Sequence, residues 1–425
     1  MIRLQRLFLL ILLMTHILYG KTLSLQEAID ATLASHPDAK LALYQLDTAR
    51  ESLGIAKAST YPELNLNAEY FPTKTLVSQN NGSFVTRDHF STHLDVTLTY
   101  TLWDFGRMQK RIDAAHEESD SALALTENAK ALLSEKVWQA YYSLAYIERV
   151  NEANALSLAF YQGLYDQALH MKNVGLKTEA DSERLYASLL EAKDLLATSR
   201  NEGRKFIHLL HILTGMRENN IIIEDDFTER SRTSLPSFTD TQWHQTLKSN
   251  NAELKALASK INQNQSLYES SQKEHYGTVV SVGSMGSDTS LSSYSSNQIG
   301  IKASVPLFTG GRLSHQIEKD RVAILLAKEA LHSREFALWQ ELYEAILDTN
   351  RLDSTIEAKK MAARALGKTV SITEGRYKEG LSTYIEVLEA QRAYDNAKIS
   401  QNAAMLQKIA AMAHIQRLIP QGVNP

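Results

Sequence analysis

Three carboxylates follow closely on two similar Gly-Leu pairs, and their spacing is the pattern in this sequence that best suits a chemical role. Asp181 lies six residues after Gly175, and Glu386 and Glu389 lie six and nine residues after Gly380. On helices repeated around a pore, each position would become a ring of carboxylates, which favours cations over anions. The alternative is a solvated helix face without a role in permeation.

Catalytic or metal chemistry is not indicated by the remaining residues. The 13 histidines are scattered, and the closest pairs, His208/His211 and His89/His93, lack the neighbours of a metal site or a catalytic triad. The chain has no cysteine, which excludes disulfides and Cys-based zinc sites, and it has no P-loop motif. We therefore predict no enzymatic activity, no metal and no cofactor. The formal charge of −4, without a basic patch, predicts no nucleic-acid partner.

The N-terminus predicts export. Arg3 and Arg6 precede an apolar run at residues 7–18 and then Gly20, which is the pattern of a secretory signal peptide over residues 1–20. The run is too short for a transmembrane helix, and no later segment reaches 18 consecutive apolar residues. Such a chain is either a soluble secreted protein or a protein that crosses a membrane as a β-barrel.

An internal repeat with an offset of 205 residues organises the chain. Alternating apolar residues of the first half have apolar counterparts in the second half. They are Leu94, Val96, Leu98, Tyr100 and Leu102, which correspond to Ile299, Ile301, Ala303, Val305 and Leu307. Gly175-Leu176 corresponds to Gly380-Leu381 at the same offset. Upstream, residues 35–38 match residues 250–253 at an offset of 215, so we place the ten extra residues of the first copy in a loop at 72–90.

Each copy contains a predicted β-hairpin, because apolar and polar residues alternate with a period of two. Strands of about ten residues with one apolar face fit a membrane barrel, although a half-buried soluble hairpin has the same pattern. The predicted hairpins are 63–102, with a polar loop at 72–90, and 278–307, with strands at 278–286 and 296–307.

A long helix is predicted after each hairpin. Residues 104–174 contain no proline, and apolar residues recur there with the alternating four- and three-residue spacing of coiled coils. This stripe comprises Leu133, Val137, Ala140, Leu144 and Ile147, with counterparts at Leu338, Leu342, Ala345, Thr349 and Leu352. A helix of this length would be about 105 Å long. The second copy predicts a long helix at 312–374, and return helices are predicted at 178–213 and 382–418.

These elements predict five segments. They are a signal peptide (1–20), a first repeat (21–213), a connecting segment (214–240), a second repeat (241–419, beginning with helices at 241–275) and a tail (420–425). One chain supplies four amphipathic strands, which cannot close a membrane barrel. Two chains would give eight strands around a filled interior, and three would give twelve strands around a lumen. We therefore favour a homotrimer.

Several motifs in this order resemble those of a known family. They are YPELNL at 61–66, LWDFGR at 102–107, VPLFTGGR at 305–312, NVGL at 173–176 and RYKEGL at 376–381. Together they resemble the TolC-type outer-membrane efflux proteins over nearly the whole mature length. One departure is the sequence EHYG at 274–277, which enters the second hairpin without the usual proline.

The resemblance implies a mainly helical α+β fold. In it, a trimer would build a twelve-stranded transmembrane β-barrel that continues into a long periplasmic α-helical barrel. It also implies a location in the outer membrane of a Gram-negative bacterium, extending into the periplasm. Family members are passive exit ducts of tripartite efflux or type I secretion systems, which carry small molecules or polypeptides. Their partners are a periplasmic adaptor, or membrane fusion, protein and an inner-membrane transporter of RND or ABC type.

The resemblance also assigns roles to single residues. Asp181, Tyr377, Glu386 and Glu389 would form a periplasmic gate, although the family's frequent arginine is replaced by Ser382, so an ion-pair lock is not expected there. Gly175, Leu176, Gly380 and Leu381 would dock the adaptor, whereas their plainer role is to end a helix. Residues at the junction between barrel and helices would be Trp103, Gly106, Arg107, Phe308, Gly311 and Arg312.

A different class of protein shares part of this pattern. A secreted coiled-coil surface or structural protein, such as an adhesin or a filament subunit, would explain the signal peptide and the helical stripe. It would not explain two matched amphipathic hairpins at equivalent points of a repeat. The sequence does not identify the cargo or the transporter.

Overall fold

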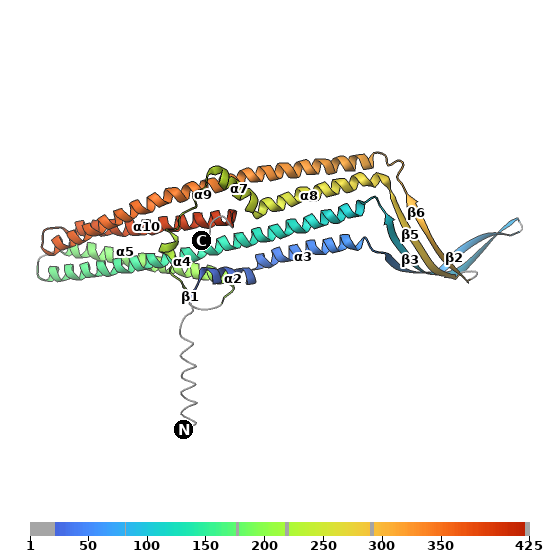
Figure 1. Cartoon of the computed structure of the whole chain (residues 1–425). Helices are drawn as coiled ribbons and strands as arrows, with labels where there is room; N and C mark the ends of the chain where they lie inside the picture. The colour runs from blue at the N-terminus through green and yellow to red at the C-terminus, as the bar shows by residue number, and fades with distance from the viewer. Residues whose placement is uncertain (1–21, 81, 176–177, 217–220, 290–292, 421–425) are drawn as a thin grey trace, which may run out of the picture. The chain divides into compact units, whose positions relative to one another are not determined.

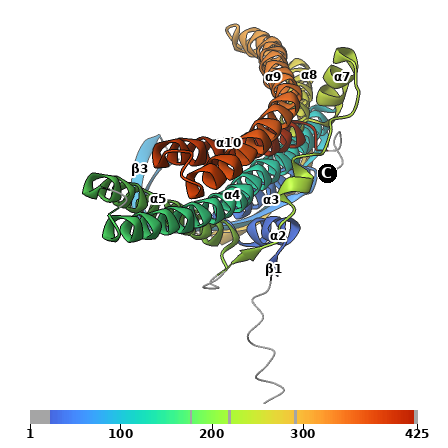
Figure 2. The same cartoon turned by 90° about the vertical axis from the view of Figure 1, so that its left-hand side faces the viewer.

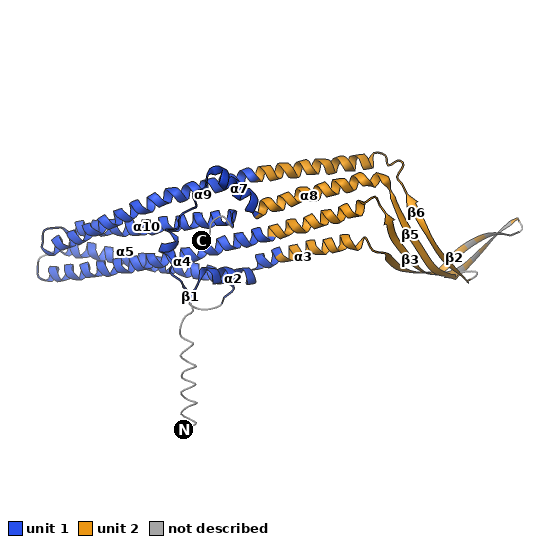
Figure 3. Ribbon diagram, viewed as in Figure 1, with its two compact units in different colours: residues 1–42, 126–251, 335–425 blue, residues 43–125, 252–334 orange. Residues whose placement is uncertain are grey.

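The computed structural model describes residues 22–80, 82–175, 178–216, 221–289 and 293–420. The predicted signal peptide, Leu176 and residues 421–425 lie outside this range. The chain divides into two compact units (Figure 3). Unit 1 comprises residues 1–42, 126–251 and 335–425, and unit 2 comprises residues 43–125 and 252–334.

The elements of the two halves follow one another in the same order (Figure 1). The first half contains β1 (Thr22–Leu23), α2 (Leu25–Ser35), α3 (Pro37–Ala58), β2 (Glu63–Asn80), β3 (Ser83–Trp103), α4 (Arg107–Asn173) and α5 (Glu179–Thr214). A connection with β4 (Ile222–Ile223) and α6 (Phe227–Arg230) follows. The second half contains α7 (Asp240–Asn250), α8 (Ala252–Lys273), a 3₁₀ turn (Glu274–Tyr276), β5 (Thr278–Thr289), β6 (Ser293–Ser304), α9 (Arg312–Lys378) and α10 (Tyr384–Leu418).

Corresponding helices of the two halves have nearly the same length, as the internal repeat predicts. α2 and α7 each have 11 residues, α3 and α8 each have 22, and α4 and α9 each have 67. α5 and α10 have 36 and 35. The structure ends the second long helix at Lys378 rather than at residue 374, and it begins the first at Arg107 rather than at residue 104.

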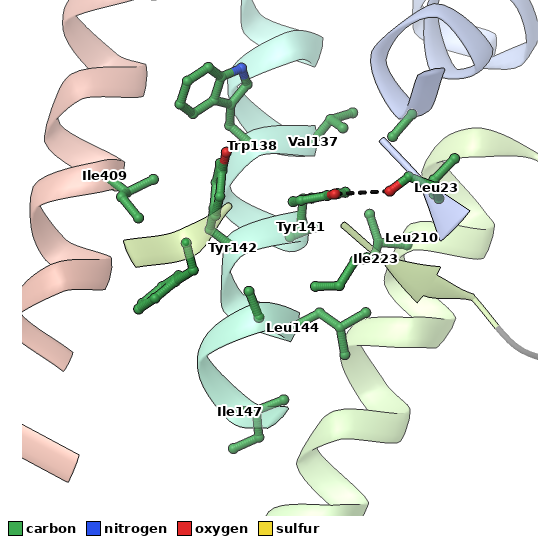
Figure 4. Close-up of a cluster of buried hydrophobic side chains, with 14 of the residues drawn as sticks. Leu23, Val137, Trp138, Tyr141, Tyr142, Leu144, Ile147, Leu210, Ile223 and Ile409 are labelled. Carbon is green, nitrogen blue, oxygen red and sulfur yellow. Dashed lines mark hydrogen bonds between the residues drawn. The ribbon is translucent and has the colours of Figure 1, made fainter. Parts of the chain in front are cut away.

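The predicted helical stripe is buried in unit 1. All ten of its residues, five on α4 and five on α9, are 9 % exposed or less. On α4, Val137, Leu144 and Ile147 pack in a hydrophobic cluster with Leu210 of α5 and Ile409 of α10 (Figure 4). Burial of such side chains stabilises a fold by about 1.5–3 kcal/mol each. The stripe therefore holds helices of both halves in one core.

Two tyrosines fasten the connecting segment to the same core. The Tyr141 hydroxyl donates a hydrogen bond to the Leu23 carbonyl at 2.9 Å (Figure 4) and accepts one from the Glu224 amide at 3.0 Å. This places it at the parallel pairing of β1 with β4. The Tyr142 hydroxyl donates to Asp226 at 2.8 Å. Residues of the predicted connecting segment 214–240 are thus positioned by side chains of the long helix α4.

Unit 2 contains a four-stranded antiparallel sheet of order β2-β3-β5-β6. Because paired residues share a face, the register gives the sheet one apolar and one polar face. The apolar face carries Leu64, Leu66, Leu94, Val96, Leu98, Met285, Ile299 and Ile301. The polar face carries Asn65, Asn67, Glu69, His93, Asp95, Thr97, Ser284, Asp288 and Gln298. Among the helices that the structure describes, none combines the length and the hydropathy of a membrane-spanning helix.

The prediction of a polar loop at 72–90 is wrong. β2 continues to Asn80 and β3 begins at Ser83, with a register shift between Phe71 and Lys74. β2 and β3 have 18 and 21 residues, whereas β5 and β6 have 12 each. The extra residues of the first copy therefore lengthen its strands. The second hairpin also departs from the predicted strands 278–286 and 296–307, because β5 reaches Thr289 and β6 spans Ser293–Ser304.

Candidate functional site

Unit 1 contains the two helix reversals on which the predicted gate and docking residues lie. Figure 2 looks onto the end of this unit at which α4 is followed by α5 and α9 is followed by α10. Gly175 and Gly380 adopt left-handed φ angles of +77° and +76°. Their amides donate to the carbonyls of Lys172 and Tyr377, both at 3.0 Å. Each glycine therefore ends a long helix in the conformation that glycine adopts most easily.

The surface of these turns is open. A Cβ added at Gly175 or Gly380 would meet no described atom within 4 Å. Leu381 is 64 % exposed and Val174 is 57 % exposed. The turns thus present exposed apolar side chains next to glycine backbone. The predicted docking residue Leu176 lies outside the described residues.

Two of the predicted gate carboxylates cap the return helices. The Thr178 hydroxyl accepts from the Asp181 amide at 3.3 Å, and the Thr178 amide donates to the Asp181 carboxylate at 3.2 Å. At α10, the Thr383 hydroxyl accepts from the Glu386 amide at 3.3 Å. The first arrangement is a capping box, in which the third helical residue reaches back to the residue before the helix, whereas α10 is capped by the Thr383 hydroxyl. The Thr-x-x-acid pattern was a signal for this role that the sequence interpretation did not use.

Ser382 binds Glu386. Its hydroxyl donates to one carboxylate oxygen at 2.6 Å, while the Thr383 hydroxyl donates to the other at 3.1 Å. The bond from Ser382 lowers the pKa of Glu386, so the carboxylate stays charged. Glu389 differs, because its exposed side chain has no hydrogen-bond or ion-pair partner among the residues that the structure describes. Glu389 is therefore exposed and, unlike Glu386, is not bound by a described side chain.

Tyr377 lies inside the packed end of unit 1. It is 3 % exposed and belongs to a cluster, here called the tip cluster, drawn from both halves of the chain. The cluster comprises Tyr161, Leu164, Ala168, Leu185, Leu189, Ala192, Tyr377, Tyr384, Val387 and Leu388. Burial raises the pKa of Tyr377, and the nearby charge of Asp181 raises it further. Tyr377 and Asp181 therefore lie near enough to each other to interact electrostatically.

Three polar contacts that the sequence interpretation missed also join the two halves. Arg184 of α5 donates to the Tyr384 hydroxyl of α10 at 3.2 Å. Ser157 of α4 donates to Asp395 of α10 at 2.8 Å, and burial raises the pKa of that carboxyl. Arg392 and Glu191 form an ion pair at 2.6 Å. These partners are about 200 residues apart in sequence, so no local pattern could reveal them.

The first predicted junction, in unit 2, is built on an aspartate. Asp104 is 9 % exposed, and its carboxylate accepts from the amides of Gly106 at 3.0 Å and Met108 at 2.5 Å. It therefore caps α4, which explains why the helix begins at Arg107. Trp103 ends β3 with 60 % of its surface exposed, and its ring lies 6.1 Å from that of Phe105. The exposed ring suits a membrane interface.

The second junction has the same backbone conformation as the first. Phe105 and Gly106 have φ angles of +59° and +78°, and their counterparts Gly310 and Gly311 have +61° and +85°. Phe308 is 91 % exposed. Arg312 forms an ion pair with Glu274 at 2.9 Å, whereas the Arg107 carbonyl accepts a hydrogen bond from Ser270 at 3.2 Å.

Gly277 replaces the proline expected before the second hairpin. It has a φ of +81°, and a Cβ there would lie 2.1 Å from the Ser304 carbonyl oxygen. Only glycine fits a backbone packed this closely. Among the described residues, no group of three or more His, Asp or Glu side chains could hold a metal ion.

Comparison with known proteins decides the family. The model of the outer membrane efflux protein family matches the chain twice, at residues 28–204 and 243–420. The chain belongs to this family. The two matched segments correspond to the two halves of the internal repeat.

Individual relatives of the chain agree with this family assignment. The outer membrane protein TolC of Salmonella enteritidis is 23 % identical over 398 residues, which cover 88 % of this chain and 77 % of TolC. The solved structure of CusC has a TM-score of 0.80 at 16 % identity and covers 93 % of this chain and 91 % of that chain. The outer membrane protein VceC of Vibrio cholerae has a TM-score of 0.78 at 18 % identity, with 93 % and 95 % covered.

The family assignment establishes the fold, the location and the general function of the protein. The outer membrane efflux protein has the TolC-type fold, lies in the outer membrane and acts in efflux. This decides between the two classes left open by the sequence pattern, since an adhesin or filament subunit does not share the family.

Proposed function

We propose that the chain forms a homotrimeric exit duct, in which three copies close a twelve-stranded transmembrane β-barrel. One observation supports this proposal above the others. Within the described residues, β2 and β6 are the edges of the sheet, and each pairs on one side only. In lipid, every unpaired backbone group on such an edge costs several kcal/mol. The edges of one chain must therefore pair with the edges of others.

The strand directions permit this closure. β2, β3, β5 and β6 alternate in direction, so β6 of one copy is antiparallel to β2 of the next. The apolar face would contact lipid and the polar face would line the lumen. Eight strands from two copies would enclose an interior filled by side chains, whereas twelve from three copies leave an open lumen.

The helical end of unit 1 would form the periplasmic entrance. Asp181, Tyr377, Glu386 and Glu389 would gate it, with the exposed Glu389 ring acting on passing ions and the tip cluster holding the helices together. Gly175, Leu176, Gly380 and Leu381 would dock a periplasmic adaptor protein. An inner-membrane transporter of RND or ABC type would supply the energy, in a tripartite efflux or type I secretion system for small molecules or polypeptides.

Cysteine cross-linking tests the trimer, because the chain has no cysteine of its own. Ile301→Cys on β6 is combined in turn with Leu64→Cys, Leu66→Cys or Ala68→Cys on β2. Within one chain, two strands lie between β2 and β6. The two edge strands are thus about 14 Å apart, beyond the reach of a disulfide. Any cross-link therefore joins two copies.

One of the three cysteine pairs should match the register in which β6 of one copy pairs with β2 of the next. For that pair, we expect a ladder of cross-linked dimers and trimers that ends at three chains. Ile301→Cys combined with Asn65→Cys or Asn67→Cys is the matched control. These asparagines lie on the polar face, so their pairs should not cross-link. A detergent-extracted protein that stays monomeric, or a ladder that ends at another number, would refute the trimer.

A further inference from the structure

A histidine on the polar face of the sheet lies between two aspartates. The His93 Nε2 atom is 2.9 Å from the Asp95 carboxylate, and its Nδ1 atom is 3.1 Å from the Asp288 carboxylate. The Asn67 amide donates to the second oxygen of Asp95 at 3.2 Å. The contacts join β2, β3 and β5. We call the first two contacts the Asp–His–Asp bridge.

The strand register builds this bridge. Glu69, His93 and Asp288 face one another across three strands, and Asp95 lies opposite Gly286 in the next row of the same face. A Cβ at Gly286 would lie 2.8 Å from the Cβ of Asp95. The glycine thus leaves the space that the Asp95 side chain occupies. The side chains of His93, Asp95 and Asp288 are 36 %, 12 % and 25 % exposed, so water reaches them.

The protonation state follows from the geometry. A neutral imidazole has one N–H donor and one nitrogen lone pair, whereas the imidazolium has two donors. Both ring nitrogens of His93 face carboxylate oxygens, so two ionised aspartates are both satisfied only by the imidazolium. Loss of the proton would leave one carboxylate facing a lone pair. Histidine is the side chain that ordinarily titrates between about pH 5 and pH 8.

We propose that the Asp–His–Asp bridge makes the ion selectivity of the barrel depend on pH. The proposal rests on the trimeric duct, in which the polar face lines the lumen and three bridges form a ring. The groups facing His93 are Glu69 of β2, Asp95 of β3 and Asp288 of β5, and Tyr294 of β6 lies beside Asp288 in the register. Loss of the His93 proton removes one positive charge per chain from this ring and leaves its carboxylates without that counter-charge, and rings of carboxylates favour cations.

The test is the reversal potential of the full-length trimer in a planar bilayer under a KCl gradient. As the pH rises from about 5 to about 8, the cation-to-anion permeability ratio of the wild type should increase. An increase of about twofold is expected for a unit charge acting across several ångströms of water. His93→Asn retains a hydrogen-bond donor but does not titrate, so its ratio should stay constant over this range.

His116→Asn is the matched control, because His116 also lies 3.1 Å from an aspartate, Asp120, but on helix α4. This variant should keep the wild-type profile. If His93→Asn does not assemble, Asp288→Asn replaces it. That variant should show a lower cation preference at pH 8 and a weaker pH response, because the bridge loses one carboxylate.

The proposal is overturned if the wild-type ratio does not change with pH. It is also overturned if the variant that assembles, His93→Asn or Asp288→Asn, keeps the wild-type profile. Failure of the duct itself gives a different result, since the wild-type protein would then form no channels in the bilayer.

Discussion

Substitution of Gly380 separates the two roles proposed for the helix turns. The left-handed φ of +76° is the only strain that a side chain would meet, because a Cβ there has no described atom within 4 Å. Alanine in this conformation costs about 1–2 kcal/mol, whereas asparagine adopts it more readily. If glycine serves only to end the helix, Gly380→Ala should therefore be more harmful than Gly380→Asn.

Docking predicts the opposite order. A partner backbone that approaches the bare glycine would be displaced further by the larger asparagine than by alanine. We expect both variants to form trimers, since the tip cluster is unchanged and the strain is small. We expect Gly380→Asn to reduce binding of the adaptor at least as strongly as Gly380→Ala does.

The assay has two readouts. Heat-modifiable migration of trimers in gels measures stability, and a loss of about 1 kcal/mol should lower the melting temperature by a few degrees at most. Copurification with the adaptor protein measures docking. Gly82→Asn is the control, since Gly82 has a φ of +81° and also has no described atom within 4 Å. Wild-type adaptor binding by Gly380→Asn, together with impaired binding by Gly380→Ala, would refute the docking role.

Two further predictions concern carboxylates of unit 1. Glu389→Gln should reduce the cation preference of the channel in planar bilayers more than Glu386→Gln does, because Ser382 and Thr383 already bind Glu386. Equal selectivity of both variants and the wild type would argue against a lumenal position of Glu389. Burial acts to raise the pKa of Glu135, but the hydrogen bond with His414 and the charge of Arg417 outweigh it, so the pKa lies below its ordinary value of 4.5. The stabilisation is therefore present above pH 4.5 and is lost as the pH falls through the lower folded value. Glu135→Gln should make thermal stability less sensitive to acid below pH 4.5, and an unchanged pH profile would contradict this.

The sequence by itself determined the repeated units and the faces of their elements. The stripe from Leu133 to Ile147 is buried as predicted, because a helix that repeats apolar residues every three or four positions has one face that must leave water. The alternation around Leu94 and Ile299 likewise predicted two-faced strands. Even Thr349, the polar member of the stripe, is fully buried, and its hydroxyl donates to the Ala345 carbonyl at 2.8 Å.

Strand length was not predictable in the same way. Residues 72–90 include Pro72, Lys74 and Asp88, and their polar character suggested a loop. In the structure β2 and β3 remain paired there, with the Thr75 hydroxyl donating to Asp88 at 2.7 Å. Pairing with a neighbouring strand satisfies the backbone of a polar segment as well as that of an apolar one. Hydrophobic alternation therefore marks only the part of a hairpin whose face is apolar.

Tertiary structure alone decided how the candidate site is assembled. The resemblance of the chain to the family assigned Tyr377 to a gate. The burial of Tyr377, however, depends on residues of α4 and α5, which lie about 200 residues earlier. The contacts Arg184–Tyr384 and Arg392–Glu191, and the Asp–His–Asp bridge across three strands, have the same origin. Local sequence sets which face of an element is apolar, because that depends on neighbours along the chain. Which polar groups meet depends on how the elements pack, and only the folded chain determines that.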